Sequence, residues 1–310
     1  MNFRRIAQNL GKMLILLAVM MATTLFWTIF VYDEASTTVA FVISALITAA
    51  SGGTLLLWGR NEGGGTILRS EAILMVAIAW ALLGVFGGLP YMVDGAFTNP
   101  ADAYFEAISG FTTTGSTVLI DIAGQSRGLH WWRALTHWIG GLGIVVLFVA
   151  IFPQLGVGGK FLFKSEVPGP ITEGLKPKIR QTGTILWLIY TIFTLVLFFL
   201  LWFLCGMTPH DAICHAFSTM ATGGFSTQNG SIADFNSPRI EWIITVFMLL
   251  GGINFGLYYS VWRGRWQDFF RDRELLTFLA IIAIATAVIT LNIWNTEPLE
   301  LHSSLLDSLR

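Results

Sequence analysis

Seven apolar segments, each close to the length that crosses a bilayer, constrain the fold of this chain more than any other feature. A transmembrane helix needs about 20 mostly apolar residues, and a helix satisfies its backbone hydrogen bonds within the segment. Only 12% of the residues are charged and 54% are hydrophobic, whereas soluble domains carry about 25% charged residues. The sequence therefore predicts an all-α membrane protein with seven transmembrane helices. They are expected over approximately 11–32, 36–58, 71–93, 129–152, 183–206, 240–262 and 275–294.

The positive charges predict the orientation of these helices, because cytoplasmic loops carry an excess of Lys and Arg. With a cytoplasmic N-terminus, only four of the 18 Lys and Arg residues fall on the outer side: Arg127, Arg133, Arg239 and Arg310. We therefore expect a cytoplasmic N-terminus and a first apolar segment that is retained as a helix. The net charge of −1 argues against a nucleic-acid partner.

Two shorter apolar segments, near 101–111 and 210–220, lie on the outer side, each between two full-length segments. They belong to a repeat with a constant offset of 109 residues. The stretch "PADAYFEAISGFTTTG" from Pro100 and the stretch "PHDAICHAFSTMATGG" from Pro209 share seven identities in 16 positions without a gap. Such self-similarity indicates a structural repeat. The sequence therefore predicts two re-entrant pore helices, one in each repeat.

The beginnings of these short segments have the residues that start a helix. Asn99 and Thr208 suit the N-cap position, and a proline follows each of them at the first helical position. Asp102 and Asp211 fall in the first turn, where a carboxylate complements the positive end of the helix dipole. Both short helices are therefore expected to be stable features of the fold.

The polar residues after each short helix are candidates for binding a cation. A helix of about 12 residues rises about 18 Å, so it ends near mid-bilayer with its negative end inward. Irregular backbone is tolerated there only where it lines a cavity or is buried in protein. Glycine and threonine allow an extended chain whose carbonyl oxygens replace the hydration shell of a monovalent cation. The candidate filter residues are Thr113, Thr114, Gly115, Thr222, Gly223 and Gly224.

Glu106, inside the first short helix, is an ionisable residue at membrane depth and is a functional candidate for that reason. Two roles remain open for it: it braces the filter, or it lies in the outer vestibule. Arg133 and Arg239 each lie near the outer start of a following apolar segment. We expect both of them to anchor their helices at the membrane interface.

The spacing of the histidines does not favour a metal site. His130 and His137 are seven residues apart, and His210 and His215 are five apart, whereas a helical zinc pair needs a spacing of four. We expect no metal other than a transported cation. No arrangement of nucleophile and base favours an enzyme.

Five stretches of the chain carry a resemblance to a known family. They are "FEAISGFTTTGSTV", "WRALTHWIGGLGIVVL", "EVPGPITEGLKPKIRQTGTILWLIY", "HAFSTMATGGFST" and "LLGGINFGLYY". Together they resemble the bacterial Trk-type potassium uptake proteins, specifically the TrkH/TrkG membrane subunits. The resemblance implies channel-like span–pore-helix–span repeats around one ion path, preceded by two extra N-terminal helices.

This resemblance implies a division of the chain into five parts. An extra two-helix region is followed by a first repeat, a cytoplasmic connection, a second repeat and the start of a third repeat. The boundaries are 1–69, 70–153, 154–182, 183–263 and 264–310.

The resemblance also implies a cargo, a location and partners. Residues 113–115 match the first filter segment of the family and residues 222–224 match the second. The transported ion is then K⁺, with no organic cofactor, and the location is the bacterial inner membrane. Expected partners are membrane lipids, a second copy in a homodimer, and a cytosolic TrkA-like nucleotide-binding regulatory subunit that docks near 154–182.

The chain departs from the family in length, since it has two filter segments where the family has four. A third repeat begins at 275–294 and stops at Arg310. We expect the chain to be about the first half of a potassium-translocating pore. Two alternatives remain open: a truncated, non-conducting membrane fragment, or a half-subunit that needs a second chain.

Overall fold

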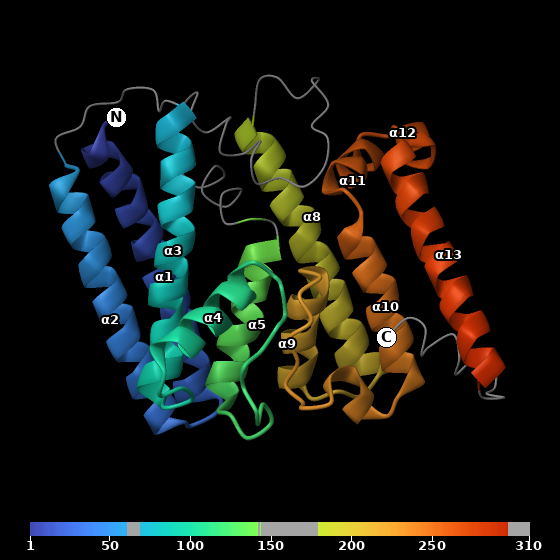
Figure 1. The fold of residues 1–310 in the computed structure, drawn as a ribbon, viewed down its shortest axis with the longest axis horizontal. Helices are drawn as coiled ribbons and strands as arrows, with labels where there is room; N and C mark the ends of the chain where they lie inside the picture. The colour runs from blue at the N-terminus through green and yellow to red at the C-terminus, as the bar shows by residue number, and fades with distance from the viewer. Residues whose placement is uncertain (61–68, 142, 144–178, 297–310) are drawn as a thin grey trace.

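The computed structural model describes residues 1–60, 69–141, 143 and 179–296, and all regular structure within these residues is helical (Figure 1). The longer helices run side by side in Figure 1. The elements are α1 (Phe3–Phe30), α2 (Ala35–Trp58), α3 (Arg69–Asp94), α4 (Pro100–Phe111), α5 (Arg127–Gly141), α8 (Ile179–Phe199), the π-helix η2 (Leu200–Leu204), α9 (Pro209–Met220), the 3₁₀ helix η3 (Ser231–Phe235), α10 (Pro238–Gly252), α11 (Phe255–Trp262), α12 (Trp266–Arg271) and α13 (Arg273–Thr296).

Five of the seven predicted spans are present as long apolar helices. Their most apolar windows have mean hydropathy between 1.9 and 2.5, and each helix has at least 20 residues, which is enough to cross a membrane. The predicted bounds differ from the observed ones mainly at the ends, because polar residues extend the helices beyond the apolar core. These five helices are Phe3–Phe30, Ala35–Trp58, Ser70–Asp94, Thr184–Leu204 and Arg273–Asn292.

The prediction of one continuous helix over 240–262 is wrong. α10 and α11 are separate helices that meet at an angle of 85°. Ile253 is extended, with a ψ of 139°, and the side chain of Asn254 caps α11 by accepting a hydrogen bond from the Gly256 amide at 2.9 Å. Two glycines at the end of α10 weaken the helix, and the asparagine cap then starts a new one. Hydropathy alone does not detect this break.

Two other predicted segments are described only in part. α5 covers the first residues of the predicted span 129–152 and ends at Gly141. Most of the remainder of that span, and residues 154–178 of the predicted cytoplasmic connection, lie outside the described residues. The same holds for 297–310 at the end of the predicted third repeat.

The first two helices pack at very short range. A Cβ atom placed on Gly11 would lie 2.7 Å from the carbonyl oxygen of Gly52, and one placed on Gly52 would lie 3.0 Å from that of Gly11. Small residues at such a crossing let two backbones approach closely, as is common between membrane helices. Gly53, the next residue, has open space around its Cα.

The carboxylate of Glu34, between α1 and α2, caps the start of α5. It accepts hydrogen bonds from the backbone amides of Arg127 at 2.8 Å and Gly128 at 3.0 Å. These amides have no partner within the helix, and a negative charge there complements the helix dipole. The N-terminal helix pair is thereby attached to the first repeat.

α5 also joins the two repeats. Trp138 donates through Nε1 to the hydroxyl of Thr194 on α8 at 3.0 Å, and Tyr190 donates to the carbonyl of Trp138 at 3.1 Å. The Trp138 ring stacks on Phe217 of α9 with 5.2 Å between ring centroids. In Figure 1, α5 accordingly lies between α4 and α9. The two candidate filter segments therefore rest on one shared helix.

Candidate functional site

The short helices α4 and α9 begin as the sequence predicts. Asn99 accepts a hydrogen bond from the Ala101 amide at 3.1 Å, and Thr208 accepts one from the Asp211 amide at 3.1 Å. Each helix has 12 residues, with proline in the first turn. Both helices occupy the lower half of the view in Figure 1, beside the lower parts of the long helices.

α4 ends in a Schellman motif, a paired hydrogen-bond arrangement that reverses the chain direction. The Thr113 amide donates to the Gly110 carbonyl at 3.0 Å, and the Thr114 amide donates to the Ser109 carbonyl at 2.9 Å. Thr113 occupies the left-handed position of this motif, with a φ of 55°. The chain therefore turns back directly into the first candidate filter segment.

α9 ends in the same way, at the positions 109 residues further on. The Thr222 amide donates to the Thr219 carbonyl, and the Gly223 amide donates to the Ser218 carbonyl, both at 2.9 Å. Thr222 has a φ of 53°. The repeat in the sequence is thus a repeat in backbone geometry, down to the individual hydrogen bonds.

A left-handed conformation recurs at the third residue of each segment. Gly115 has a φ of 75° and Gly224 has a φ of 93°. Glycine adopts such values without steric penalty, whereas a β-branched threonine at positive φ is strained. Both segments therefore have a positive φ at their first and third residues, and this pattern differs from that of a β-strand.

The two segments lie against each other. A Cβ atom on Gly115 would overlap the carbonyl oxygen of Gly223, and it would lie 3.5 Å from the Cα of Gly224. A Cβ atom on Gly223 would overlap the imidazole of His137. Glycine is therefore required at 115 and 223 for close approach, in addition to the positive φ at 115. The structure brings all six predicted filter residues together at the ends of α4 and α9.

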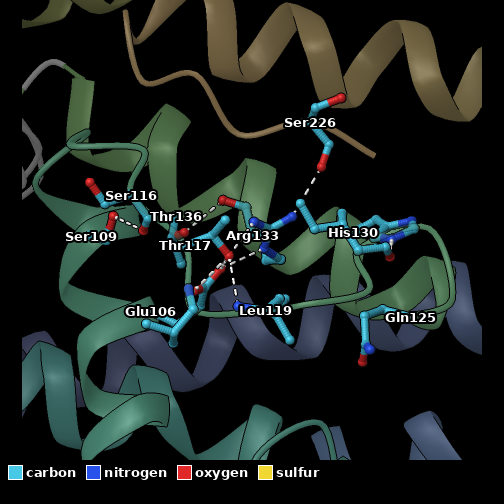
Figure 2. A network of polar contacts seen from close by, with 12 residues as sticks. Glu106, Ser109, Ser116, Thr117, Leu119, Gln125, His130, Arg133, Thr136 and Ser226 are labelled. Atoms are coloured by element: carbon cyan, nitrogen blue, oxygen red, sulfur yellow. Dashed lines mark hydrogen bonds and ion pairs between the residues drawn. The ribbon is translucent and has the colours of Figure 1, made fainter. Parts of the chain in front are cut away.

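Glu106 is fully buried and takes part in an ion pair with Arg133 (Figure 2). The Nε of Arg133 lies 2.9 Å from Oε1 of Glu106. The hydroxyl of Thr117 donates to Oε1 at 2.9 Å, and the Val118 amide donates to Oε2 at 3.1 Å. Glu106 thus contacts the chain that follows the first filter segment. Its full burial is not that of a side chain exposed in an outer vestibule.

The prediction that Arg133 anchors its helix at the membrane interface is wrong, because its side chain is only 1% exposed. Its Nη1 donates to the Ser226 carbonyl at 3.0 Å, and its Nη2 donates to the Thr117 hydroxyl at 3.3 Å. The Phe225 ring covers the guanidinium, with 4.1 Å between Cζ and the ring centroid. A buried charge needs such pairing and hydrogen bonding.

The second repeat has a histidine and a serine where the first has the carboxylate and a threonine. The offset of 109 places His215 at the position of Glu106 and Ser226 at the position of Thr117. His215 contacts the Ser226 hydroxyl through Nε2 at 2.9 Å and the Asp211 carbonyl through Nδ1 at 2.8 Å. Aligning the two repeats beyond the filter would have revealed this equivalence in the sequence.

His137 is a further site residue that sequence reasoning missed. Its side chain is buried, it stacks on Phe225 with 4.0 Å between ring centroids, and its Nδ1 lies 3.2 Å from the hydroxyl of Ser218. Spacing between histidines carried no signal for this role, because His137 acts through residues more than 80 positions away.

A cavity of about 470 Å³ borders the second filter segment on the side of α10. Its lining includes Thr222, Gly223, Gly224 and the buried Glu241. In the described part of the chain, no group of three or more His, Cys, Asp or Glu side chains is arranged to hold a metal ion. The polar groups in the lining include the Thr222 hydroxyl, the backbone of Gly223 and Gly224 and the carboxylate of Glu241.

Comparisons with known proteins agree with this geometry. Residues 34–303 match the model of the TrkH family, described as cation transport proteins. The Trk system potassium uptake protein TrkH of Halomonas elongata is 39% identical over 306 residues, which cover 97% of this chain and 62% of the relative. TrkH of Salmonella typhimurium is 37% identical, with 95% of this chain and 61% of the relative covered.

The fold agrees as well. The crystal structure of the potassium transporter TrkH from Vibrio parahaemolyticus superposes with a TM-score of 0.84 at 30% sequence identity. The match covers 100% of this chain and 63% of that one. This chain thus spans 61% of the length of the Salmonella typhimurium relative and 62% of that of the Halomonas elongata relative. The family match and the apolar helices establish a multi-pass bacterial membrane protein, and the chain belongs to the TrkH family of cation transport proteins.

Proposed function

We propose that this chain forms part of a potassium uptake path in which backbone carbonyls of two filter segments bind the ion. The segments are 113–115 and 222–224. The observation that carries the proposal is the matched backbone of the two segments, with the same Schellman turn and the same pattern of positive φ. A shared ligand accounts for two copies of the same strained backbone that lie against each other.

The physical argument for a cation is electrostatic. The C-terminal ends of α4 and α9 meet the filter segments, and a helix carries about half a negative charge at that end. Carbonyl oxygens replace the water of a monovalent cation when several of them face one axis. The name "potassium uptake protein" belongs to the relatives, and it makes K⁺ the ion that we assign to this site.

We further propose that Glu106 supports the first filter segment. Its carboxylate accepts from both Thr117 and Val118, which begin two residues after Gly115. The carboxylate therefore holds the residues that directly follow that segment, and it does not need to contact the ion.

The whole-protein features remain part of the proposal, because this chain spans about 61% of the length of its relatives. They comprise seven spans, a cytoplasmic N-terminus and a division of the chain into five parts. The boundaries of these parts are 1–69, 70–153, 154–182, 183–263 and 264–310. The proposed partners are a second copy, surrounding lipids and a TrkA-like regulatory subunit. The family is one of cation transport and not an enzyme class.

The test is ion uptake by the complete protein in liposomes, comparing the wild type with Gly115→Ala and Gly224→Ala. A methyl group at 115 overlaps the Gly223 carbonyl, and an alanine at 224 is strained at a φ of 93°. We expect both variants to lose K⁺ uptake or its preference over Na⁺.

The matched control is Gly53→Ala, because Gly53 lies in α2 with nothing within 4 Å of an added Cβ. This variant is expected to transport like the wild type. Wild-type rates and K⁺ preference in both filter variants would overturn the filter assignment.

A further inference from the structure

We infer that Arg133 is a positioning residue that holds the two filter segments at a fixed separation from each other. This inference rests on the proposed function, since it concerns the same ion site. It is not implied by the pairing with Glu106 alone, because that pairing involves only the first repeat. It follows from the hydrogen-bond acceptors of the other two guanidinium nitrogens, Nη1 and Nη2.

The guanidinium bridges equivalent positions of the two repeats. Its Nη2 donates to the Thr117 hydroxyl at 3.3 Å, and its Nη1 donates to the Ser226 carbonyl at 3.0 Å. Thr117 lies two residues after Gly115, and Ser226 lies two residues after Gly224. Figure 2 shows Arg133 between Glu106 and Thr117 on one side and Ser226 on the other. One planar group therefore sets the distance between the outer ends of both segments.

The geometry requires arginine. Its five donors lie in one rigid plane, so Nε, Nη1 and Nη2 serve three acceptors at once, whereas the ammonium of lysine is a compact point charge. Burial adds to the rigidity, because the Arg133 and Glu106 side chains are 1% and 0% exposed. The Phe225 ring on the guanidinium face restricts the remaining freedom.

Ser226 is held from both repeats. Arg133 of the first repeat binds its carbonyl at 3.0 Å, and His215 of the second repeat contacts its hydroxyl at 2.9 Å. The first filter segment, in contrast, is tied to the carboxylate of Glu106 within its own repeat. Arg133 thus makes a charged link between the repeats, while His215 and Ser226 contact each other within the second repeat.

The consequence concerns selectivity. The preference for K⁺ depends either on the size of the cavity or on the number and field strength of the coordinating carbonyls. In both cases it depends on how the two segments are placed relative to each other. Without the bridge, the outer ends of the two segments lose their charged link and are held by neutral contacts, such as the hydrogen bonds from the Ile122 and Ala123 amides to Asn229. We therefore expect Arg133→Lys, which keeps a positive charge beside Glu106 but loses the bridge, to lower the K⁺/Na⁺ ratio.

The experiment compares Arg133→Lys and Thr117→Val with the wild type, using the complete protein in liposomes. The readouts are the K⁺/Na⁺ uptake ratio and the amount of folded protein. Arg133→Lys keeps the charge but loses the bridge, and we expect its ratio to fall about tenfold, as for loss of one hydrogen bond to a charged group. Thr117→Val removes one arm of the bridge, together with the Thr117 hydrogen bond to Glu106, and keeps the Arg133 contact with Ser226, so it is expected to lower the ratio less.

The matched control is Arg239→Lys, since Arg239 lies near the start of α10 and is exposed. It is expected to keep the wild-type ratio. A folded Arg133→Lys protein with the wild-type ratio overturns the inference. If Arg133→Lys does not fold, Thr117→Val decides: a lower ratio supports the bridge and an unchanged ratio overturns it. A wild type without K⁺ preference contradicts the proposed function itself, which separates the two failures.

Discussion

Two threonines occupy a backbone conformation that glycine usually fills. Thr113 and Thr222 are the left-handed residues of the turns that end α4 and α9. A left-handed L-residue costs about 1–2 kcal/mol, and such strain persists only where the surrounding structure over-determines it. The hydrogen bonds of the two turns therefore hold both threonines in a conformation that an unconstrained threonine avoids.

This reading predicts an order of stabilities at position 222. Thr222→Gly removes the left-handed penalty, whereas Thr222→Ala removes the same hydroxyl but keeps the penalty. We expect the glycine variant to be more stable than the alanine variant by about 1 kcal/mol. Thermal unfolding of both proteins in the same detergent measures the difference. Equal stabilities, or a more stable alanine variant, would show that residue 222 is not held at positive φ.

The buried ion pair predicts strong coupling between two residues. Glu106→Gln leaves the Arg133 charge buried without its counterion, and breaking such a pair costs about 3–5 kcal/mol. The double variant Glu106→Gln, Arg133→Met removes both charges, so it is expected to be less destabilised than the sum of the single changes. Denaturant unfolding of the four proteins gives the coupling energy. Additive effects would argue against the direct contact.

The sequence predicts the candidate filter residues and a possible brace at Glu106, but not the role of Arg133. Thr113, Gly115 and their equivalents were identified because a constant offset exposed the repeat. Arg133 was misplaced, because a charge near the end of an apolar segment has the same sequence signature whether it points to lipid headgroups or into the protein. Only the structure distinguishes these two orientations, because in it Arg133 donates to the Ser226 carbonyl.

Helix ends, in contrast, were well predicted where their chemistry is local. α4 and α9 begin at a cap, a proline and an aspartate that are adjacent in the sequence. The bend between α10 and α11 was not predicted, since the stretch is apolar throughout and its cause is two glycines followed by an asparagine cap. Continuous hydropathy therefore predicts a helical region but not its straightness.

The close packing of α1 against α2 predicts that two neighbouring glycines of α2 differ in their tolerance to substitution. Gly52 faces the backbone of α1 at contact distance, whereas Gly53 has open space around it. Gly52→Leu is therefore expected to separate the two helices and lower the thermal stability, and Gly53→Leu is expected to have little effect. Thermal unfolding of the two variants in detergent tests this contrast. Equal tolerance at both positions would contradict the close crossing.

In the whole molecule, the N-terminal helix pair packs on the first repeat through apolar side chains and is also linked to it by the carboxylate of Glu34. Glu34 satisfies two amides at the start of α5. Glu34→Ala is expected to destabilise the protein by about 1–2 kcal/mol, as for loss of a strong helix cap. Glu34→Gln keeps a hydrogen-bond acceptor, and its stability is expected to lie between those of the wild type and Glu34→Ala.

The control for the charge is Asp33→Asn, since Asp33 is exposed and asparagine tolerates its φ of 53°. Amide hydrogen exchange at the start of α5 reports the effect directly. Unchanged protection there in Glu34→Ala would mean that the helix pair is held by other contacts.

The central claim is that the backbone of 113–115 and 222–224 binds a monovalent cation. It is tested most directly by an anomalous-scattering map of the complete protein crystallised with Rb⁺ in place of K⁺. We predict Rb⁺ peaks coordinated by the carbonyl oxygens of both segments, lost when Na⁺ replaces Rb⁺. A clear map with no ion at these carbonyls, or with ions only elsewhere in the protein, would contradict it.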